Sequence, residues 1–387
     1  MSDRFAFGEN WKNFVEKHFS EERAATASNN LLQSLQLQNL EGMRFLDIGC
    51  GSGLHSLAAW RAGASHVCSF DYDVNSVDTT KALWRMAGQP ENWTVLQGSV
   101  LDAELMSGLG KFDIVYSWGV LHHTGDMWAA IRNAAIPVAC NGVFFVALYS
   151  DTTYRDGSWS NMPTPEQWLH IKQSYNAASP LRKRYMECKH VWRNYFAPVR
   201  CNPLKFLRAG ARLARDILTY KQSRGMEFWT DVRDWMGGWP MEFVKEQDYI
   251  RVCAEELGLE PLRLNTGEGN TEFLFRPKDS HNYWDHIISQ RQFFPLPEPV
   301  THEAGQMFSV KIPSLGNKNT VWERRKPSTL TLFEDGFPLA YRCAQKIGIE
   351  KGGSGRYLHC ENTLYFSSSD LSDPRHSGRS YTYCMEP

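Results

Sequence analysis

Short apolar runs of strand type alternate with helix-compatible segments over the first 150 residues of the chain. Strands that alternate with helices at this spacing predict βαβ units, and βαβ units predict a parallel sheet. Because parallel strands end at one edge of a sheet, a ligand is expected beyond those ends. Five runs have the length and the branched or aromatic content of strands: 43–47, 66–71, 93–97, 112–117 and 142–149.

Beyond residue 150 the pattern changes to helical spacing with many tryptophans. Six Trp fall within 150–243, and residues 180–224 hold twelve Lys or Arg against two acids, a local balance of +10. Such a stretch forms a solvated helix face, a surface for an anionic substrate or a nucleic acid, or a helix at a membrane surface. Residues 204–220 place apolar side chains near helical spacing with arginines between them, which fits an interfacial helix.

The chain then returns to the sheet through an amphipathic helix at 245–257 and two strand candidates, 260–264 and 272–276. After a stretch rich in Pro, Ser and Gly, β-type segments follow that are separated by Asp-Gly, Gly-Gly and Asp-Pro turns. The predicted fold is α/β: a Rossmann-like, doubly wound, seven-stranded sheet with a helical insertion, followed by a small all-β module. The predicted domains are 1–277 (core sheet from 39–149 and 245–277, insertion 150–244), a linker at 278–327 and an antiparallel β module at 328–387.

Composition and charge narrow the class of protein. Of 387 residues, 42% are hydrophobic and 22% are charged, a composition that excludes wholesale disorder. The net charge of −1 argues against a general RNA-binding protein, which is expected to be basic. The longest apolar run, 143–149, is far short of the roughly 18 residues that a membrane helix needs. Nine scattered Cys without a Cys-x-x-Cys pair favour neither a disulfide framework nor a zinc site. We therefore expect a soluble, cytoplasmic protein without a metal and without a secretory signal.

The run FLDIGCGSG at 45–53 carries the first chemistry, because it places three glycines directly after a predicted strand. Glycine lets backbone approach a ligand closely and adopt positive φ in the turn. The glycine spacing differs from the dinucleotide fingerprint, and the run lacks the Gly-Lys-Ser/Thr ending of a triphosphate loop. Asp47 stands inside the motif, where it would repel a pyrophosphate and favour a cationic ligand.

Three further motifs follow the next three strands. Asp71 ends the second strand, where an acid accepts the hydroxyls of a ribose. The run GSVLD at 98–102 follows the third strand at the expected height of a purine ring, and SWGVLHH at 117–123 ends the fourth. Together the four motifs describe a cofactor with a ribose, a base and a positively charged group, and no phosphate.

In combination and order, these motifs resemble those of class I S-adenosylmethionine-dependent methyltransferases, and they are most similar to the small-molecule branch that includes the quinone-biosynthesis enzymes. The resemblance covers residues 40–150 and, more loosely, 245–276. It implies S-adenosylmethionine as the cofactor and a set of residues around it. These are Asp47 near the ammonium, Gly49, Gly51 and Gly53 along the methionine, Asp71 at the ribose, Ser99 and Val100 at the adenine, and Ser117 and Trp118 on the aminoacyl side, with Cys50 and Tyr72 as further cofactor-binding residues.

Two positions modify this correspondence. Many relatives have an acid where this chain has Ser99, so Asp102 is the alternative residue at the adenine. The entry Phe7-Gly8-x-x-Trp11 resembles the lid helix of the same branch, which implies that Trp11 closes the cofactor pocket.

His122 and His123 follow the fourth strand, where the acceptor atom would lie. Histidine titrates near neutrality and can take the acceptor's proton, but it can also cap a helix, and methyl transfer by proximity alone needs no base. The sequence around Arg233, Trp235 and Trp239 interleaves charge, Gly-Gly and Trp, which is typical of either a substrate wall or a packed core.

The resemblance implies methyl transfer to an O, N or S atom of a small molecule, a glycan precursor or a modified peptide. We expect the β module to have an accessory role. The basic insertion favours an anionic acceptor. Three alternatives stay open: a tRNA- or RNA-modifying methyltransferase, a cofactor-binding protein without catalysis, and transfer of an altered alkyl group. The oligomeric state is left open.

Overall fold

The computed structural model describes residues 19–155, 163–199, 202–224, 228–266, 270–312, 328–342 and 345–385, so that Trp11 lies outside the described residues. The chain divides into two compact units, one comprising Met1–Ala139 and Pro163–Glu242 and the other Cys140–Met162 and Phe243–Pro387.

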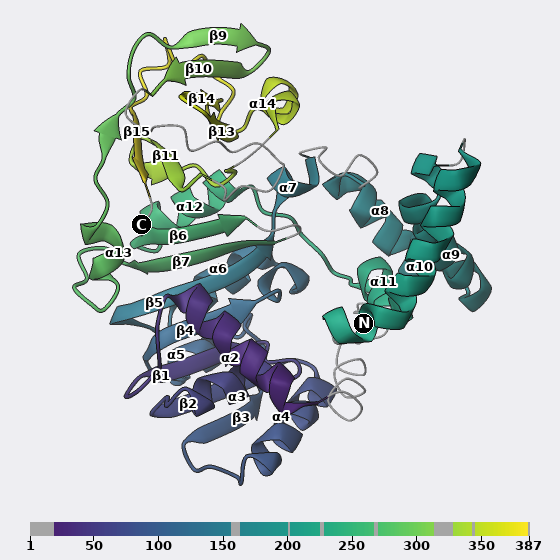
Figure 1. The fold of residues 1–387 in the computed structure, drawn as a ribbon. Helices are drawn as coiled ribbons and strands as arrows, with labels where there is room; N and C mark the ends of the chain where they lie inside the picture. Colours follow the sequence, from purple (N-terminus) through teal and green to yellow (C-terminus); the bar gives the residue numbers. More distant parts are fainter. Residues whose placement is uncertain are drawn as a thin grey trace. The chain divides into compact units, whose positions relative to one another are not determined.

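A sheet of seven strands runs in the order β3-β2-β1-β4-β5-β7-β6, which confirms the predicted α/β fold with a Rossmann-like sheet (Figure 1). In the first unit, β1 pairs in parallel with both β2 and β4, and β2 pairs in parallel with β3. In the second unit, β7 pairs antiparallel with both β5 and β6. The strands are β1 (Arg44–Ile48), β2 (His66–Asp71), β3 (Trp93–Gln97), β4 (Phe112–Trp118), β5 (Val138–Tyr149), β6 (Leu259–Thr266) and β7 (Asn270–Pro277).

Aspartate side chains set where three helices of the first unit begin. Asp73, Asp102 and Asp126 each occupy the N-cap position after a strand or loop, and each accepts a hydrogen bond from a backbone N–H of the first helical turn. Such caps satisfy N–H groups that have no partner within the helix. The helices therefore start at fixed positions, which holds the loops with the candidate residues at the strand ends. The helices are α2 (Glu21–Leu35), α3 (Leu54–Arg61), α4 (Val74–Met86), α5 (Ala103–Gly108) and α6 (Met127–Ala135).

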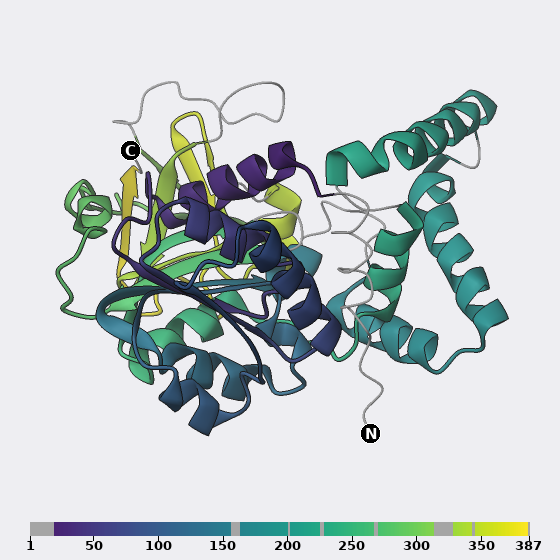
Figure 2. The same cartoon turned by 90° about the horizontal axis from the view of Figure 1, so that it is seen from below.

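The Trp-rich insertion is helical, as its pattern predicts, and Figure 2 shows its helices grouped together in teal. Trp168 is buried, with its ring 5.8 Å from that of Trp235 and 5.7 Å from that of His190, so it lies in the core of this group. The helices of the first unit here are α8 (Pro165–Asn176), α9 (Pro180–Tyr195), α10 (Pro203–Arg224) and α11 (Phe228–Gly237).

The second unit holds both ends of the inserted segment. Ser150 forms a parallel bridge with Val244, the Asp151 N–H donates to the Val244 carbonyl at 2.8 Å, and the Val244 N–H donates to the Tyr149 carbonyl at 2.9 Å. Below this bridge the buried Glu246 accepts hydrogen bonds from the hydroxyls of Ser150 and Thr152. The unit's helices here are α7 (Asp151–Arg155) and α12 (Glu246–Glu255).

Two four-stranded sheets complete the second unit, in the orders β13-β14-β10-β9 and β12-β11-β15-β8. Apolar side chains of both sheets share one buried cluster that includes Val310, Leu332, Leu364 and Tyr383. The elements are α13 (Asp285–Ser289), β8 (Phe294–Pro295), β9 (Thr301–Ala304), β10 (Met307–Lys311), β11 (Leu330–Glu334), β12 (Phe337–Pro338), α14 (Lys346–Gly352), β13 (Tyr357–Cys360), β14 (Thr363–Phe366) and β15 (Tyr381–Met385).

The observed division of the chain differs from the predicted domain boundaries in two ways. Strands β9 and β10 lie within 278–327, the segment expected to be a linker with some short structure, and β10 pairs antiparallel with β14. Strands β5, β6 and β7 group with the C-terminal sheets rather than with residues 39–139. The reason is long-range hydrogen bonding, since Gln247 donates to the Pro338 carbonyl, Thr266 to the Ala340 carbonyl and Arg356 to the Thr152 carbonyl. None of the described helices combines the length and hydropathy needed to span a membrane.

Candidate functional site

The turn after β1 contains Gly49, Gly51 and Gly53, which together are called the glycine cradle. At Gly49 there is no room for a larger side chain. Gly49 has a φ of +75°, and a Cβ atom placed on it would lie 2.4 Å from the Cγ1 atom of Val120. Val120 belongs to the loop that follows β4, so the ends of two adjacent parallel strands meet here. Gly51 and Gly53 also have positive φ, which only glycine adopts without strain. The cradle therefore depends on the glycines that the sequence predicts for it.

Asp47 is buried in β1 below this cradle and is held by a chain of hydrogen bonds. The Ser56 hydroxyl donates to the Asp47 carboxylate at 2.5 Å and accepts from the Ser69 hydroxyl at 2.7 Å. The Ser69 oxygen in turn accepts from the Trp93 indole N–H at 2.9 Å. Burial raises the pKa of Asp47 to about 7, with a smaller contribution from the nearby charge of Asp71. A buried carboxylate of this kind favours a positively charged partner.

Asp71 lies at the end of β2, where two backbone groups orient its carboxylate. One oxygen accepts from the Gly51 N–H at 3.0 Å and the other from the Asp73 N–H at 2.9 Å. Burial raises its pKa. In the described part of the chain, neither Asp47 nor Asp71 forms an ion pair with a Lys or Arg side chain. The site therefore places two carboxylates at one cradle, and the neighbouring Tyr72 is exposed.

The third-strand motif lies at the loop between β3 and α5. The Ser99 hydroxyl accepts from the Leu101 N–H at 3.2 Å, and the carbonyl of the buried Val100 accepts from the Asn133 side chain at 3.0 Å. Asp102, the alternative to Ser99, caps α5 by accepting from the Leu105 N–H at 3.0 Å. This capping bond accounts for an acid at position 102 without any ligand.

The remaining predicted cofactor residues differ in burial: Cys50 and Ser117 are buried, and Trp118 is exposed. The buried thiol of Cys50 accepts from the Thr80 hydroxyl at 3.2 Å, and the buried Ser117 hydroxyl donates to the Ile48 carbonyl at 3.2 Å. Their side chains thus hold the turn and the strand ends together. Trp118 is 46% exposed, so its ring presents an apolar surface at the end of β4.

The two histidines after β4 lie in a 3₁₀ turn and differ in burial. His122 is completely buried, whereas His123 is partly exposed. The Nδ1 atom of His123 is 2.7 Å from the Pro240 carbonyl, and because a carbonyl only accepts, Nδ1 carries the proton. Burial lowers the pKa of His123 to about 3 and that of His122 well below its usual range, so both rings are neutral near pH 7.

The segment after α11, residues 238–242, forms hydrogen bonds with this histidine turn. Besides the bond from His123 to Pro240, the Glu242 N–H donates to the His122 carbonyl at 2.9 Å, and the Glu242 carboxylate accepts from the Met127 N–H at 2.9 Å. The helical insertion therefore ends at the carboxyl end of β4, beside the predicted acceptor position.

The predicted substrate residues lie on or after α11, and two of them take part in contacts within the insertion. The Arg233 guanidinium is 3.9 Å from the buried carboxylate of Glu187. The Trp235 ring packs against Trp168, and its carbonyl accepts a 2.5 Å hydrogen bond from the buried Lys172 ammonium. Trp239 directly precedes Pro240 in the segment bonded to the histidine turn.

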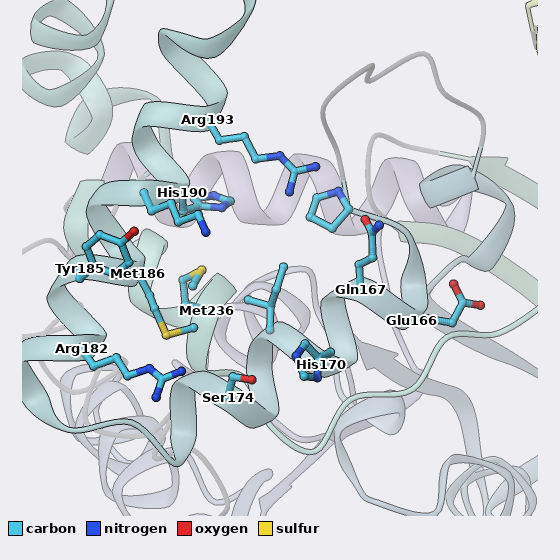
Figure 3. Close-up of a pocket in the computed structure, with 13 residues that line it drawn as sticks. Glu166, Gln167, His170, Ser174, Arg182, Tyr185, Met186, His190, Arg193 and Met236 are labelled. Carbon is cyan, nitrogen blue, oxygen red and sulfur yellow. The ribbon is translucent and has the colours of Figure 1, made fainter.

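A groove of about 700 Å³ lies between α8 and α9, with Met236 of α11 in its wall (Figure 3). Its apolar surface includes Ile171, Met186 and Met236. Figure 3 shows the side chains of Met186 and Met236 in the middle of the groove and the guanidinium groups of Arg182 and Arg193 toward opposite ends.

The cations of the groove are not neutralised by neighbouring acids. Arg182, Lys189 and Arg193 line it together with a single acid, Glu166, and none of the three forms an ion pair within the described ranges. These three cations do not stand out in the sequence, because α9 lies in a generally basic segment where they look like the other lysines and arginines. The one usable signal was the local charge of +10.

Similarity to known proteins agrees with this geometry. A family profile described as a methyltransferase domain matches residues 18–188. The chain contains a class I S-adenosylmethionine-dependent methyltransferase domain. Over 113 residues this domain is 33% identical to the ubiquinone biosynthesis O-methyltransferase of Methylobacterium nodulans, which covers 29% of this chain and 43% of that protein. Over 87 residues it is 38% identical to the tRNA U34 carboxymethyltransferase of Alcanivorax borkumensis, which covers 22% of this chain and 26% of that protein.

A solved magnesium protoporphyrin IX methyltransferase of Synechocystis with bound SAH aligns with a TM-score of 0.40 and 14% identity, over 70% of this chain and 94% of that one. The chain spans less than half the length of the two curated relatives named above. The family profile and the two curated relatives identify the methyltransferase domain and leave the acceptor unassigned.

The residues of the methyltransferase domain fit the cofactor of its class. S-adenosylmethionine has an ammonium, a sulfonium and a ribose, and it has no phosphate. Two buried or partly buried carboxylates, Asp47 and Asp71, suit the ammonium and the ribose hydroxyls, and the glycine cradle at Gly49 suits close approach of a ligand to backbone. No group of three or more His, Cys, Asp or Glu that could hold a metal ion occurs among the described residues.

Proposed function

We propose that this chain transfers a methyl group from S-adenosylmethionine to an O, N or S atom of a small anionic molecule. The observation that carries the proposal is the pair Asp47 and Asp71, two acids that converge on a glycine cradle without a cationic partner in the described residues. When bound, the cofactor supplies an electrophilic methyl group on its sulfonium. In this proposal the protein acts in the cytoplasm.

Asp47 holds the cofactor ammonium, and Asp71 accepts hydrogen bonds from the ribose hydroxyls. Ser99 and Val100 lie against the adenine, while Trp118 shields the aminoacyl side from water. Because the transfer is an in-line displacement, most of the rate enhancement comes from holding the donor and the acceptor in line.

His123 is the better candidate than His122 for removing a proton from the acceptor. It is partly exposed, and with the proton on Nδ1 its Nε2 atom carries the lone pair. A base with a pKa of about 3 is weak, so its contribution lies at the lower end of the range for general bases, about 100-fold in rate. An acceptor that is already ionised needs no base, and His123 then only positions the loop.

The groove between α8 and α9 suits an acceptor with an apolar body and an anionic group. Its methionines and Ile171 offer apolar contact area, and Arg182, Lys189 and Arg193 offer charges with no acid paired to them in the described part of the chain. By contrast, Arg184 and Arg233 lie beside Glu187, at 3.1 Å and 3.9 Å, so their charges are used within the fold.

A turnover assay with anionic and neutral acceptors tests this assignment. The assay measures S-adenosylhomocysteine released from the full chain with aromatic or aliphatic carboxylates and phosphates, and with their neutral methyl esters. We expect Lys189→Met and Arg193→Met each to raise the KM of the anionic acceptor about tenfold, as loss of one charge-assisted contact does. Lys183→Met is the matched control, because Lys183 lies on the same helix over the Tyr175 ring and away from the groove.

Equal turnover of anions and esters, or an equal effect of all three substitutions, would remove the groove from the proposal. Cofactor binding without product from any acceptor would instead favour a cofactor-binding protein without catalysis. The match to a tRNA U34 carboxymethyltransferase supports a second candidate, methylation of tRNA. A gel shift with tRNA at two salt concentrations distinguishes it, because phosphate contacts make such binding strongly salt-dependent.

A further inference from the structure

Helix α10 exposes leucines on one side. Leu204 and Leu207 are each 70% exposed and Leu218 is 79% exposed. Positions 204, 207, 211 and 218 are separated by three, four and seven residues, so they share one face of an α-helix. Three large apolar side chains on one surface stripe are unusual on a soluble protein, because scattered single exposures are the norm.

The opposite face of α10 packs within the helical insertion. Ala209 is buried there, and the rings of Phe206 and Phe196 lie 4.9 Å apart. Asp216, the only acid of the helix, points to this side and accepts from the Tyr195 hydroxyl at 3.0 Å. The leucine face is therefore directed away from the contacts that hold α10 in place.

The charges beside the leucines are all positive. By helical spacing the cations that border the leucines are Arg208 and Arg215. Arg208 is exposed and forms no ion pair in the part of the chain that the structure describes, while Arg215 lies 3.3 Å from Asp216. The exposed side of α10 thus combines leucines with a net positive charge and contains no acid.

We propose that the exposed face of α10 binds to the surface of an anionic phospholipid membrane. Leucines enter the boundary between headgroups and acyl chains, and the arginines contact lipid phosphates, as on an interfacial amphipathic helix. The leucines decide between the interpretations of this basic segment. A solvated face gains nothing from exposed leucines, and a nucleic-acid surface needs cations without them.

The two kinds of side chain act differently on membrane binding. Each arginine or lysine near an anionic surface strengthens binding about fivefold, and this gain is lost at high salt. Each leucine strengthens binding to any bilayer in proportion to its buried area, and salt does not weaken it. Binding is therefore expected to need both an anionic lipid and the leucines.

Vesicle co-sedimentation of the full chain tests the proposal. We expect the wild type to bind vesicles in which a third of the lipid is phosphatidylglycerol at least tenfold more tightly than vesicles of phosphatidylcholine alone. Leu207→Asp and Leu218→Asp are each expected to reduce this binding about tenfold or more, and Arg208→Gln about fivefold, with the arginine effect absent on phosphatidylcholine. Leu181→Asp is the control, because Leu181 is 86% exposed on α9, outside the stripe.

Circular dichroism and the affinity for S-adenosylhomocysteine must stay unchanged in all four variants, which separates lost membrane binding from misfolding and from failure of the proposed methyl transfer. Equal binding to both kinds of vesicle, no binding to either, or an effect of Leu181→Asp as large as that of Leu207→Asp would overturn the proposal. A tRNA gel shift that Arg208→Gln weakens and Leu207→Asp leaves intact would also overturn it, in favour of a nucleic-acid surface.

Discussion

Replacing Asp47 with asparagine tests the cofactor cradle at its most buried charge. The asparagine side chain keeps an oxygen that can accept the hydrogen bond from Ser56, but it removes the negative charge. Burial raises the pKa of Asp47 from 3.8 to about 7, so the ionised form is costly until a cation binds beside it. Asp47→Asn is therefore expected to raise the stability of the ligand-free protein and to weaken its binding of the cofactor.

The effect on stability has a definite sign and size. Between pH 3.8 and about 7 the folded carboxyl holds a proton that the unfolded one has lost, so stability falls as pH rises through this window. The full difference corresponds to about 4 kcal/mol above pH 7. We expect urea unfolding of Asp47→Asn at about pH 8 to give a free energy about 2–4 kcal/mol above that of the wild type, and a value near wild type at about pH 4.

Cofactor affinity is expected to move the other way. In the wild type a proton and the ligand ammonium compete for Asp47, so calorimetric affinity for S-adenosylhomocysteine should fall about tenfold per pH unit below about pH 7. In Asp47→Asn the affinity should be about 100-fold lower at neutral pH, as for other lost buried charge pairs, and nearly independent of pH. Asp126→Asn is the control, because Asp126 is an exposed helix cap and asparagine caps equally well. A variant that loses both stability and affinity, or that keeps the wild-type pH dependence, would refute the assignment of Asp47.

Three further tests probe the first unit. Gly49→Ala should abolish cofactor binding and lower the unfolding free energy by about 2–4 kcal/mol, because the added Cβ would meet Val120. Gly42→Ala is the control, because Gly42 also has positive φ but open space around it. It should lower the unfolding free energy by about 1 kcal/mol and leave the calorimetric affinity for the cofactor unchanged. His123→Ala should lower kcat about 10- to 100-fold without changing cofactor affinity, and the wild-type kcat should show no titration near pH 6.5; a limb there would contradict the lowered pKa. Burial lowers the pKa of Lys172 to about 7, so the unfolding free energy of the wild type in urea should rise by about 2 kcal/mol from about pH 7 to 9. Lys172→Met should abolish that rise. If the variant keeps the same dependence of unfolding free energy on pH, other groups cause it.

The sequence predicted the cradle well because its signals are local. The motif at 45–53 combines a strand, a turn that needs positive φ and a helix start within a few residues, and the structure has each of them there. Asp71 could be placed at a strand end by the same reasoning, since β2 ends at that residue. The hydrogen-bond chain from Asp47 through Ser56, Ser69 and Trp93 could not be predicted, because it joins one helix and three strands that only the folded sheet brings together.

The second unit and the groove were predicted less well for the same reason. Strands β9 and β10 carry a strand-type pattern, but the Pro-rich flanks of that segment dominated its interpretation as a linker, and only pairing with β14 reveals its place. The groove combines side chains from three helices, and nothing in the local sequence of α9 separates Lys189, which lines it, from Lys183, which does not. The two roles proposed for the basic segment, on α9 and on α10, therefore appear as one charge run in the sequence.

The bridge between Ser150 and Val244 has a consequence for the evolution of this fold. Both ends of the long helical segment meet at one pair of backbone hydrogen bonds, so the chain leaves and re-enters at nearly the same point. The entropy of closing a loop grows only slowly with its length, so lengthening, shortening or exchanging the segment should have little effect on the sheet. In the function proposed above, exchange of this segment would change the acceptor while the cofactor-binding residues stay the same.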